Sequence, residues 1–243
     1  MIHQKNNIAF KVIVGSHNYH LQTKSSDEDY KVFYYPTFDD LYYGNKNSKS
    51  MMTKEQDIEF HDIRKLTLML WKSNVNFLEV LFSQKIVLKD ELYEVLKTKR
   101  EEIARMNLPY LYNACIGMYE KKRKEFIRDK QSKKVYKHAM TMWRILDFLQ
   151  RYEKNHFLNF QKSIWYESDD TNRQILLDIR NKRYQEVELE NIITEKFHSI
   201  QLLSPIYKDQ PLNYELKNWI DQTIKRYVKI NVKEELYSQF ISK

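Results

Sequence analysis

The stretch that decides the fold reads GSHNYHL at residues 15–21 and continues as SSDEDY at residues 25–30. An apolar, β-branched run, IAFKVIV, occupies residues 8–14 directly before it and ends at the glycine, which is typical of a buried strand that enters a tight turn. A second strand is predicted at residues 29–35, where a proline ends the run. Polar and acidic residues that are suited to binding or catalysis therefore lie between the two predicted strands.

Further along the chain the pattern changes from strand to helix. Residues 43–53 are polar and predict a loop, and residues 56–60 predict a short third strand. Ile63, Leu66 and Leu70 then fall at i, i+3 and i+7, which is the spacing of one helical face. The fold class is therefore predicted to be α+β, with a compact sheet first and a helical region after it. Later helices are predicted at about residues 109–130, 133–153, 171–180, 185–199 and 212–238.

Composition excludes several classes of protein. The 243 residues are 42% hydrophobic and include 18 Tyr, 12 Phe and 4 Trp, which is too apolar and aromatic for a disordered chain. Only 3 Gly and 4 Pro interrupt the chain, which favours long helices. No apolar run approaches the roughly 18–20 residues of a membrane span. The first residues lack the apolar segment of a secretory signal and Cys115 is the only cysteine, so a cytoplasmic protein without a membrane partner is expected.

Positive charge is concentrated in one segment. The formal net charge is +8, and residues 120–137 alone carry nine Lys and Arg against Glu120, Glu125 and Asp129. Such a run is either the solvated face of a long helix or a surface for polyanions, because clustered cations attract phosphates. The sequence leaves both interpretations open, and under the second the expected partner is a nucleotide or RNA.

Asp27 and Asp29 are candidate metal ligands. Alternate residues of a strand point to the same face, so the two carboxylates lie on the order of 7 Å apart along the chain. They repel each other unless a cation lies between them, and Mg²⁺ prefers hard oxygen ligands and takes further oxygens from substrate phosphates. Gly15 would allow a phosphate to approach the backbone closely, and the Ser16 hydroxyl would donate to it.

A third acid is expected if two metal ions clamp the attacking and the leaving oxygen. Asp57, in the third predicted strand, is the first choice for this ligand, and Glu59 on the same face is the alternative. If Asp57 is the ligand, it is also the group expected to take the proton from an attacking hydroxyl, provided that it lies within hydrogen-bond reach.

The order Gly-Ser, Asp-x-Asp, then a later acid resembles the nucleotidyltransferase fold of the DNA polymerase β superfamily. The resemblance is closer to a bacterial and phage-encoded subset of predicted nucleotidyltransferases that reads Gly-Ser-x-x-Tyr-x-Leu and then Ser-Asp-x-Asp. It covers roughly residues 10–150, and the last 90 or so match only in being helical. The matching positions are Gly15, Ser16, Tyr19, Leu21, Ser26, Asp27, Asp29, Arg64, Lys65, the run at 73–82, and Lys137-His138-Ala139-Met140 with Arg144.

The resemblance implies further binding residues. Lys137, His138 and Arg144 match a basic helix of the subset, and they are expected to bind the triphosphate; Lys137 and Arg144 share one helical face. The alternative interpretation of His138 is a core residue whose ring nitrogens form hydrogen bonds within the protein instead of with the triphosphate. This sequence departs from the subset at His20, Ser73, Val75 and Thr141, none of which is an expected metal ligand.

The implied activity is the Mg²⁺-dependent transfer of a nucleoside monophosphate from an NTP, such as ATP, to a hydroxyl, with two ions expected and Mn²⁺ as the alternative metal. The mixed sheet with its flanking helices would form a palm-like nucleotidyltransferase domain at residues 1–88. A helical lobe at residues 89–243 would complete the site, and its basic surface favours an RNA end as the acceptor. The alternatives are a protein acceptor and a non-catalytic nucleotide- or RNA-binding module, antitoxin-like or anti-defence in role.

Overall fold

The computed structural model describes residues 7–24, 26–53 and 56–241. Within these residues five strands form one sheet in the order β3-β4-β2-β1-β5. The sheet is mixed, because β2 and β4 run parallel while the other neighbouring pairs are antiparallel. The strands are β1 (Ile8–Val14), β2 (Glu28–Tyr34), β3 (Ser48–Met52), β4 (Gln56–Asp62) and β5 (Ile86–Lys89).

Three of these strands lie where the sequence predicts them. β1 has the predicted bounds, because five of its seven side chains are buried and β-branched residues pack well on a pleated surface. β2 begins one residue earlier than predicted, and β4 continues two residues further, to Asp62. The predicted helical pattern therefore starts after Asp62 rather than near His61.

The prediction of a loop at residues 43–53 was wrong at its second half. Ser48–Met52 forms β3, an edge strand that pairs antiparallel with β4. All five side chains of β3 are exposed. Neither face of the strand needs apolar residues, and its sequence, SKSMM, accordingly does not alternate between apolar and polar residues. Backbone hydrogen bonds to β4 hold this strand in place, and side-chain patterning carries no signal for it.

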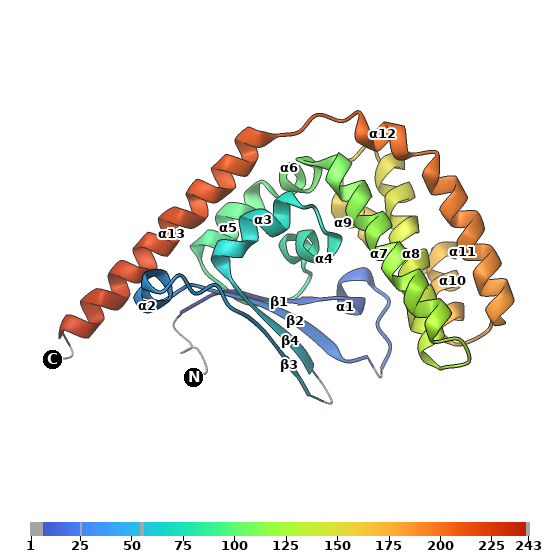
Figure 1. The fold of residues 1–243 in the computed structure, drawn as a ribbon, viewed down its shortest axis with the longest axis horizontal. Coiled ribbons are helices and arrows are strands. Elements are labelled where there is room, and N and C mark those ends of the chain that lie inside the picture. The colour runs from blue at the N-terminus through green and yellow to red at the C-terminus, as the bar shows by residue number, and fades with distance from the viewer. Residues whose placement is uncertain (1–6, 25, 54–55, 242–243) are drawn as a thin grey trace.

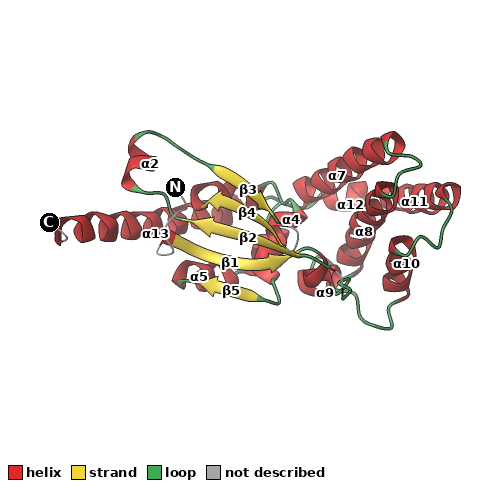
Figure 2. Ribbon diagram, turned by 90° about the horizontal axis from the view of Figure 1, so that it is seen from below, coloured by secondary structure: helices red, strands yellow, loops and turns green. Residues whose placement is uncertain are grey.

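Helices cover one face of the sheet, and Figure 2 shows the strands in front of these helices, with the second face turned to the viewer. Phe10, Val12 and Phe33 of the sheet belong to the main core, together with Leu66 and Leu92 of the covering helices. The helices and 3₁₀ turns of this region are α1 (Ser16–Tyr19), α2 (Phe38–Tyr42), η2 (Ile63–Lys65), α3 (Leu66–Trp71), α4 (Val75–Leu78), η3 (Glu79–Phe82), α5 (Glu91–Thr98) and α6 (Arg100–Arg105).

A helical lobe lies beside the end of the sheet, as Figure 1 shows. Five long helices were predicted from residue 109 onward, and all five are present with bounds within a few residues. The α+β class and the mixed sheet with a C-terminal helical lobe are thus confirmed. The helices are α7 (Leu108–Arg128), α8 (Lys134–Lys154), α9 (Phe160–Ile164), α10 (Thr171–Arg180), α11 (Glu186–Gln201), α12 (Ser204–Lys208) and α13 (Tyr214–Ile241).

The last helix, α13, leaves the lobe and returns to the helices above the sheet (Figure 1). It packs against α3 and α5, and the ring of Tyr214 lies 4.9 Å from that of Trp71, centroid to centroid. At the point of return, the Asn213 amide donates a hydrogen bond of 2.9 Å to the Met106 carbonyl, just before the lobe begins. The boundary between residues 88 and 89 stays a prediction.

Candidate active site

The site begins at the turn after β1. Gly15 adopts φ +71°, a conformation that favours glycine, and a Cβ atom at this position would overlap Oδ2 of Asp29. The Gly15 amide donates a hydrogen bond of 3.2 Å to Glu79 Oε2, which fixes the turn against the core. The absence of a side chain at position 15 therefore lets the backbone lie directly on an acidic side chain of the next strand.

The pairing of β2 with β4 brings the acidic residues together. The two strands are parallel and in register, so Asp29 lies opposite Asp57 and Lys31 lies opposite Glu59. Burial raises the pKa of Asp29, and the neighbouring carboxylates of Asp27 and Asp57 raise it further, while Lys137 and Lys31 oppose the rise. Such mutual repulsion makes this end of the sheet favourable for a cation.

The structure distinguishes the two candidates for the third acid. Glu59 is paired with Lys31, and its Oε2 lies 3.2 Å from His61 Nε2; His61 and Lys31 lower the pKa of Glu59 to about 2. Asp57 Oδ1 is buried and has no hydrogen-bond partner among the described residues. A buried, unpaired carboxylate oxygen is costly and calls for a partner. Asp57 is therefore the acid that is available to a ligand, and its role as a ligand stays a prediction.

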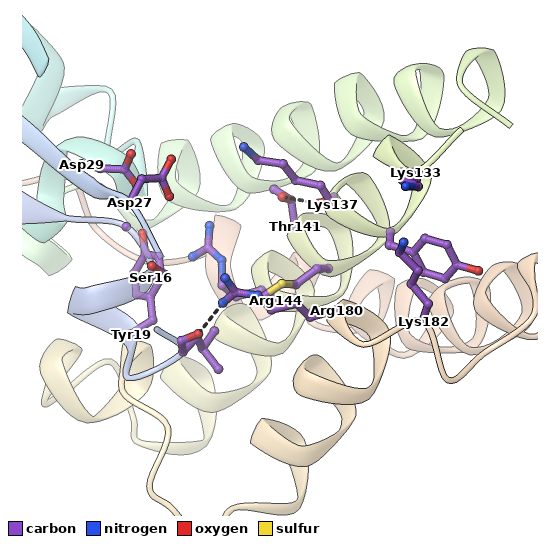
Figure 3. A pocket seen from close by; sticks show the side chains of 14 residues that line it. Ser16, Tyr19, Asp27, Asp29, Lys133, Lys137, Thr141, Arg144, Arg180 and Lys182 are labelled. Carbon is purple, nitrogen blue, oxygen red and sulfur yellow. Dashed lines mark hydrogen bonds between the residues drawn. The ribbon is translucent and has the colours of Figure 1, made fainter. Parts of the chain in front are cut away.

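A cavity of about 390 Å³ opens beside Asp29. Figure 3 shows Asp27 and Asp29 at one end of it, Ser16 and Tyr19 below them, and cationic side chains on the opposite wall. The volume lies within the range of small-molecule sites. The lining residues are Gly15, Ser16, Tyr19, Leu21, Asp27, Asp29, Lys133, Tyr136, Lys137, Met140, Thr141, Arg144, Arg180 and Lys182.

One face of α8 supplies much of the cationic wall. Lys137, Thr141 and Arg144 recur at i, i+4 and i+7, so they point to the same side, and all three line the cavity. The Arg144 guanidinium also stacks on Tyr19, with Cζ 4.1 Å from the ring centroid. The structure therefore brings Lys137 and Arg144 to the cavity with Gly15 and Ser16.

His138 is the one predicted binding residue that the structure places elsewhere. A helix turns by roughly 100° per residue, so His138 points away from the face of Lys137. Its Nε2 lies 2.9 Å from Asp129 Oδ2 and its Nδ1 lies 3.3 Å from Glu125 Oε2, both acids of the α7 end and the following turn. His138 is buried between these acids and does not line the cavity, which corrects its expected position.

Three cationic residues of the cavity were not predicted as binding residues: Lys133, which lies within the basic run at residues 120–137, and Arg180 and Lys182. Arg180 ends α10 and donates hydrogen bonds of 2.8 Å to the Leu21 carbonyl and 3.0 Å to Ser26 Oγ, so it holds the loop that carries the acids. Arg180 and Lys182 lie in the part of the chain that the motifs do not reach. The only signal was a basic pair at the end of a predicted helix, which is common in helices of any function.

Glu79 holds the turn after β1 in place. Its side chain is only 2% exposed, and it accepts hydrogen bonds of 3.2 Å from Asn18 Nδ2 and from the Gly15 amide. Burial raises the pKa of Glu79, although the Arg144 charge and the Asn18 amide oppose the rise. Glu79 is therefore a buried carboxylate with hydrogen-bond partners, and these contacts give it a structural role.

The donor set at the end of the sheet fits a hard divalent cation. Asp27, Asp29 and Asp57 offer only carboxylate oxygens, and the unpaired Asp57 Oδ1 and the repulsion around Asp29 would both be relieved by a positive ion. Among the described residues no three His, Cys, Asp or Glu side chains are grouped closely enough to hold an ion by themselves. Mg²⁺ is usually held by one or two carboxylates and by substrate phosphates, so such a grouping is not required.

A mixed sheet that carries a Gly-Ser turn and acids on two adjacent parallel strands, beside a basic cavity, defines the nucleotidyltransferase class of fold. The model of one protein family, RlaP, described as the RNA repair pathway DNA polymerase beta family, matches residues 2–220. The chain belongs to this family, which is of the DNA polymerase beta-like nucleotidyltransferase type. No curated protein matches the chain. None of the helices in the described part of the chain could cross a membrane.

Proposed function

We propose that this protein transfers a nucleoside monophosphate from an NTP to a hydroxyl at the end of an RNA, with Mg²⁺ as the cofactor. The observation that carries the proposal is the cavity that has Asp27 and Asp29 at one end and the cations of α8 and α10 at the other. A triphosphate with bound metal has the complementary distribution of charge. Its metal would lie at the acidic end of the cavity, and its negatively charged oxygens would lie against the cationic wall.

In the proposed reaction the acceptor hydroxyl oxygen attacks the α-phosphorus of the NTP. A new O–P bond forms, the bond from the α-phosphorus to the bridging oxygen breaks, and pyrophosphate leaves with the bond's electron pair. Asp57 takes the hydroxyl proton, since its Oδ1 has no other hydrogen-bond partner among the described residues. Asp27, Asp29 and Asp57 would hold two Mg²⁺ ions, which would neutralise the charge of the phosphate oxygens.

The remaining residues position the triphosphate. The Gly15 turn and the Ser16 hydroxyl would bind the β- and γ-phosphates, and Lys137 and Arg144 would bind them from the opposite wall. Arg180 keeps the acidic loop in place through Leu21 and Ser26 and also faces the cavity. Most of the rate enhancement in such a transfer comes from positioning and charge neutralisation.

The proposal is tested by incubating the protein with each α-labelled NTP and total tRNA, with Mg²⁺ or with EDTA. We expect labelled RNA and released pyrophosphate with one NTP or a subset of them, and neither product with EDTA. Transfer of the label to protein instead would contradict the RNA acceptor. The absence of turnover with RNA, protein extract and small alcohols would contradict the transferase proposal and leave a nucleotide- or RNA-binding module.

Neighbouring residues of α8 offer a matched pair of variants. Lys137→Ala removes a cation from the cavity wall, and because a hydrogen bond to a charged group contributes about 1.5–3 kcal/mol, the KM for NTP should rise roughly 10- to 100-fold. His138→Gln changes a residue that faces Glu125 and Asp129, so the KM for NTP should stay within about twofold. A larger rise for His138→Gln than for Lys137→Ala would show that the cavity is not the triphosphate site.

A further inference from the structure

A second cavity, of about 900 Å³, lies between α3 and α4 on one side and α7 on the other. It is larger than the cavity proposed for the triphosphate and separate from it. We refer to it as the α4–α7 groove. The residues that line it are Met69, Lys72, Asn74, Asn76, Phe77, Tyr110, Asn113, Ala114, Gly117, Met118, Lys121 and Lys122.

The α4–α7 groove leads toward the acid that is proposed to take the acceptor proton. A small cavity of about 180 Å³ contains Asp29 and Asp57, and Asn76 lines both this cavity and the groove. The triphosphate cavity contains Asp27 and Asp29 but not Asp57. Asp29 thus lies between the triphosphate cavity on one side and Asp57 with the groove on the other.

This order fits the geometry of the proposed transfer. In phosphoryl and nucleotidyl transfer the attacking and leaving oxygens lie roughly in line, on opposite sides of the phosphorus. If the pyrophosphate lies in the cationic cavity, the acceptor hydroxyl must approach from the side of Asp57. The α4–α7 groove opens on that side, so a chain that ends at Asp57 would extend into it.

The chemistry of the groove is that of a site for a single-stranded nucleic acid. No Asp or Glu lines it, while Lys72 and Lys121 are exposed on opposite walls and form no ion pair with any described residue. Lys122, in contrast, is paired with Glu125. Two exposed cations facing one groove give a track for phosphates.

Uncharged groups in the groove suit bases rather than a protein segment. Tyr110 is 49% exposed, and unstacked bases stack on exposed aromatic rings with little regard to sequence. Asn76 and Asn113 each carry an amide, which offers both donors and acceptors to base edges or to a 2′-hydroxyl. Together the lysines, the amides and the exposed aromatic ring are complementary to the phosphates, the base edges and the base faces of RNA, and no carboxylate in the lining repels the phosphates.

We propose that the α4–α7 groove binds the single-stranded end of the acceptor RNA and delivers its terminal hydroxyl to Asp57. This inference rests on the proposed function, because it names the surface that the acceptor uses. The basic turn between α7 and α8 would then contact RNA only outside the groove, and several of its cations are already paired, as in Arg128 with Asp129 and Lys130 with Glu190.

Binding of a fluorescein-labelled 12-nucleotide single-stranded RNA, followed by anisotropy without NTP, tests the groove. Lys72→Gln/Lys121→Gln should raise the Kd about tenfold. The negative slope of log association constant against log salt concentration should become shallower by about 1.4, because each lost phosphate contact contributes about 0.7. Tyr110→Ala should raise the Kd about tenfold at unchanged salt slope, through lost stacking. Lys225→Gln/Lys229→Gln, on the exposed side of α13, is the matched control and should bind like the wild type.

The outcomes separate the groove from the transferase proposal. Equal loss of RNA binding in the α13 control, or wild-type binding by the groove variant, would overturn the groove, even if labelled RNA still forms in the transfer assay. Loss of binding in the groove variant alone supports the groove, even if no NTP is turned over. Wild-type transfer of label to a protein by the groove variant would also overturn it, since the acceptor would then be a protein.

Discussion

Replacing Asp29 by Asn should lower the rate of nucleotide transfer by on the order of 10³ while leaving the melting temperature equal to or above that of the wild type. Charge stabilisation by a bound metal contributes several kcal/mol, and each 1.4 kcal/mol corresponds to a factor of ten in rate. The stability follows from the raised pKa of Asp29, which burial and the charges of Asp27 and Asp57 produce. A carboxyl with a raised pKa in the folded state is destabilising when charged at neutral pH, so a neutral isostere removes that cost.

Differential scanning fluorimetry with and without MgCl₂ adds a readout that does not depend on activity. Mg²⁺ with a non-hydrolysable NTP should raise the melting temperature of the wild type, and this gain should be lost in Asp29→Asn. Asp221→Asn removes an exposed carboxylate from α13 and is the control, with wild-type transfer and a wild-type gain. Retention of both the rate and the gain by Asp29→Asn would exclude this residue from metal binding.

Gly15→Ala should lower the transfer rate about 100-fold and the melting temperature by roughly 4–8 °C. Two physical effects act together at this position. The φ of +71° is strained for alanine, which costs about 1–3 kcal/mol, and the new Cβ would push Asp29 away from its place opposite Asp57. A displacement of about 1 Å at a reacting centre is sufficient for a 100-fold loss.

Gly44→Ala separates the two effects. Gly44 has a φ of +69°, nearly that of Gly15, but a Cβ atom there meets no atom within 4 Å. This variant should therefore lose stability through backbone strain and keep the wild-type transfer rate. If Gly15→Ala loses no more activity than Gly44→Ala when both are assayed below their melting temperatures, the close approach of the turn to Asp29 has no catalytic importance.

The sequence predicts those parts of the fold in which buried apolar residues recur over a whole strand or over several helical turns, but it did not predict the short strand β5. β1 and the long helices α7 and α8 carry apolar residues at the period of their structure, and each lies close to its predicted bounds. β3 does not follow this rule, because all five of its side chains are exposed and it is held by its pairing with the edge of β4. An edge strand of this kind cannot be predicted from a hydrophobic pattern.

The residues of the candidate site likewise fall into two groups, those that the helical period predicts and those that only the tertiary packing brings to the site. Lys137 and Arg144 follow from the helical period, since both point to one face, whereas the motif alone placed the adjacent His138 with them. Arg180 reaches the acidic loop only through the packing of α10 beside that loop, at a separation of more than 150 residues in the chain. The spacing of residues along a chain contains no information about such a contact.

The hydrogen bond between Asn213 and Met106 has a topological consequence. Helices α7 to α12 lie between two points of the chain that this bond joins, and both α6 before them and α13 after them lie with the helices above the sheet, so residues 107–212 are inserted between neighbouring ends. An insertion with neighbouring ends can diverge in length and shape without breaking the connectivity of its host. The wall that supplies Lys137, Arg144 and Arg180 therefore belongs to the inserted helices, whereas Asp29 and Asp57 belong to the sheet, so the two sides of the cavity come from differently connected parts of the chain.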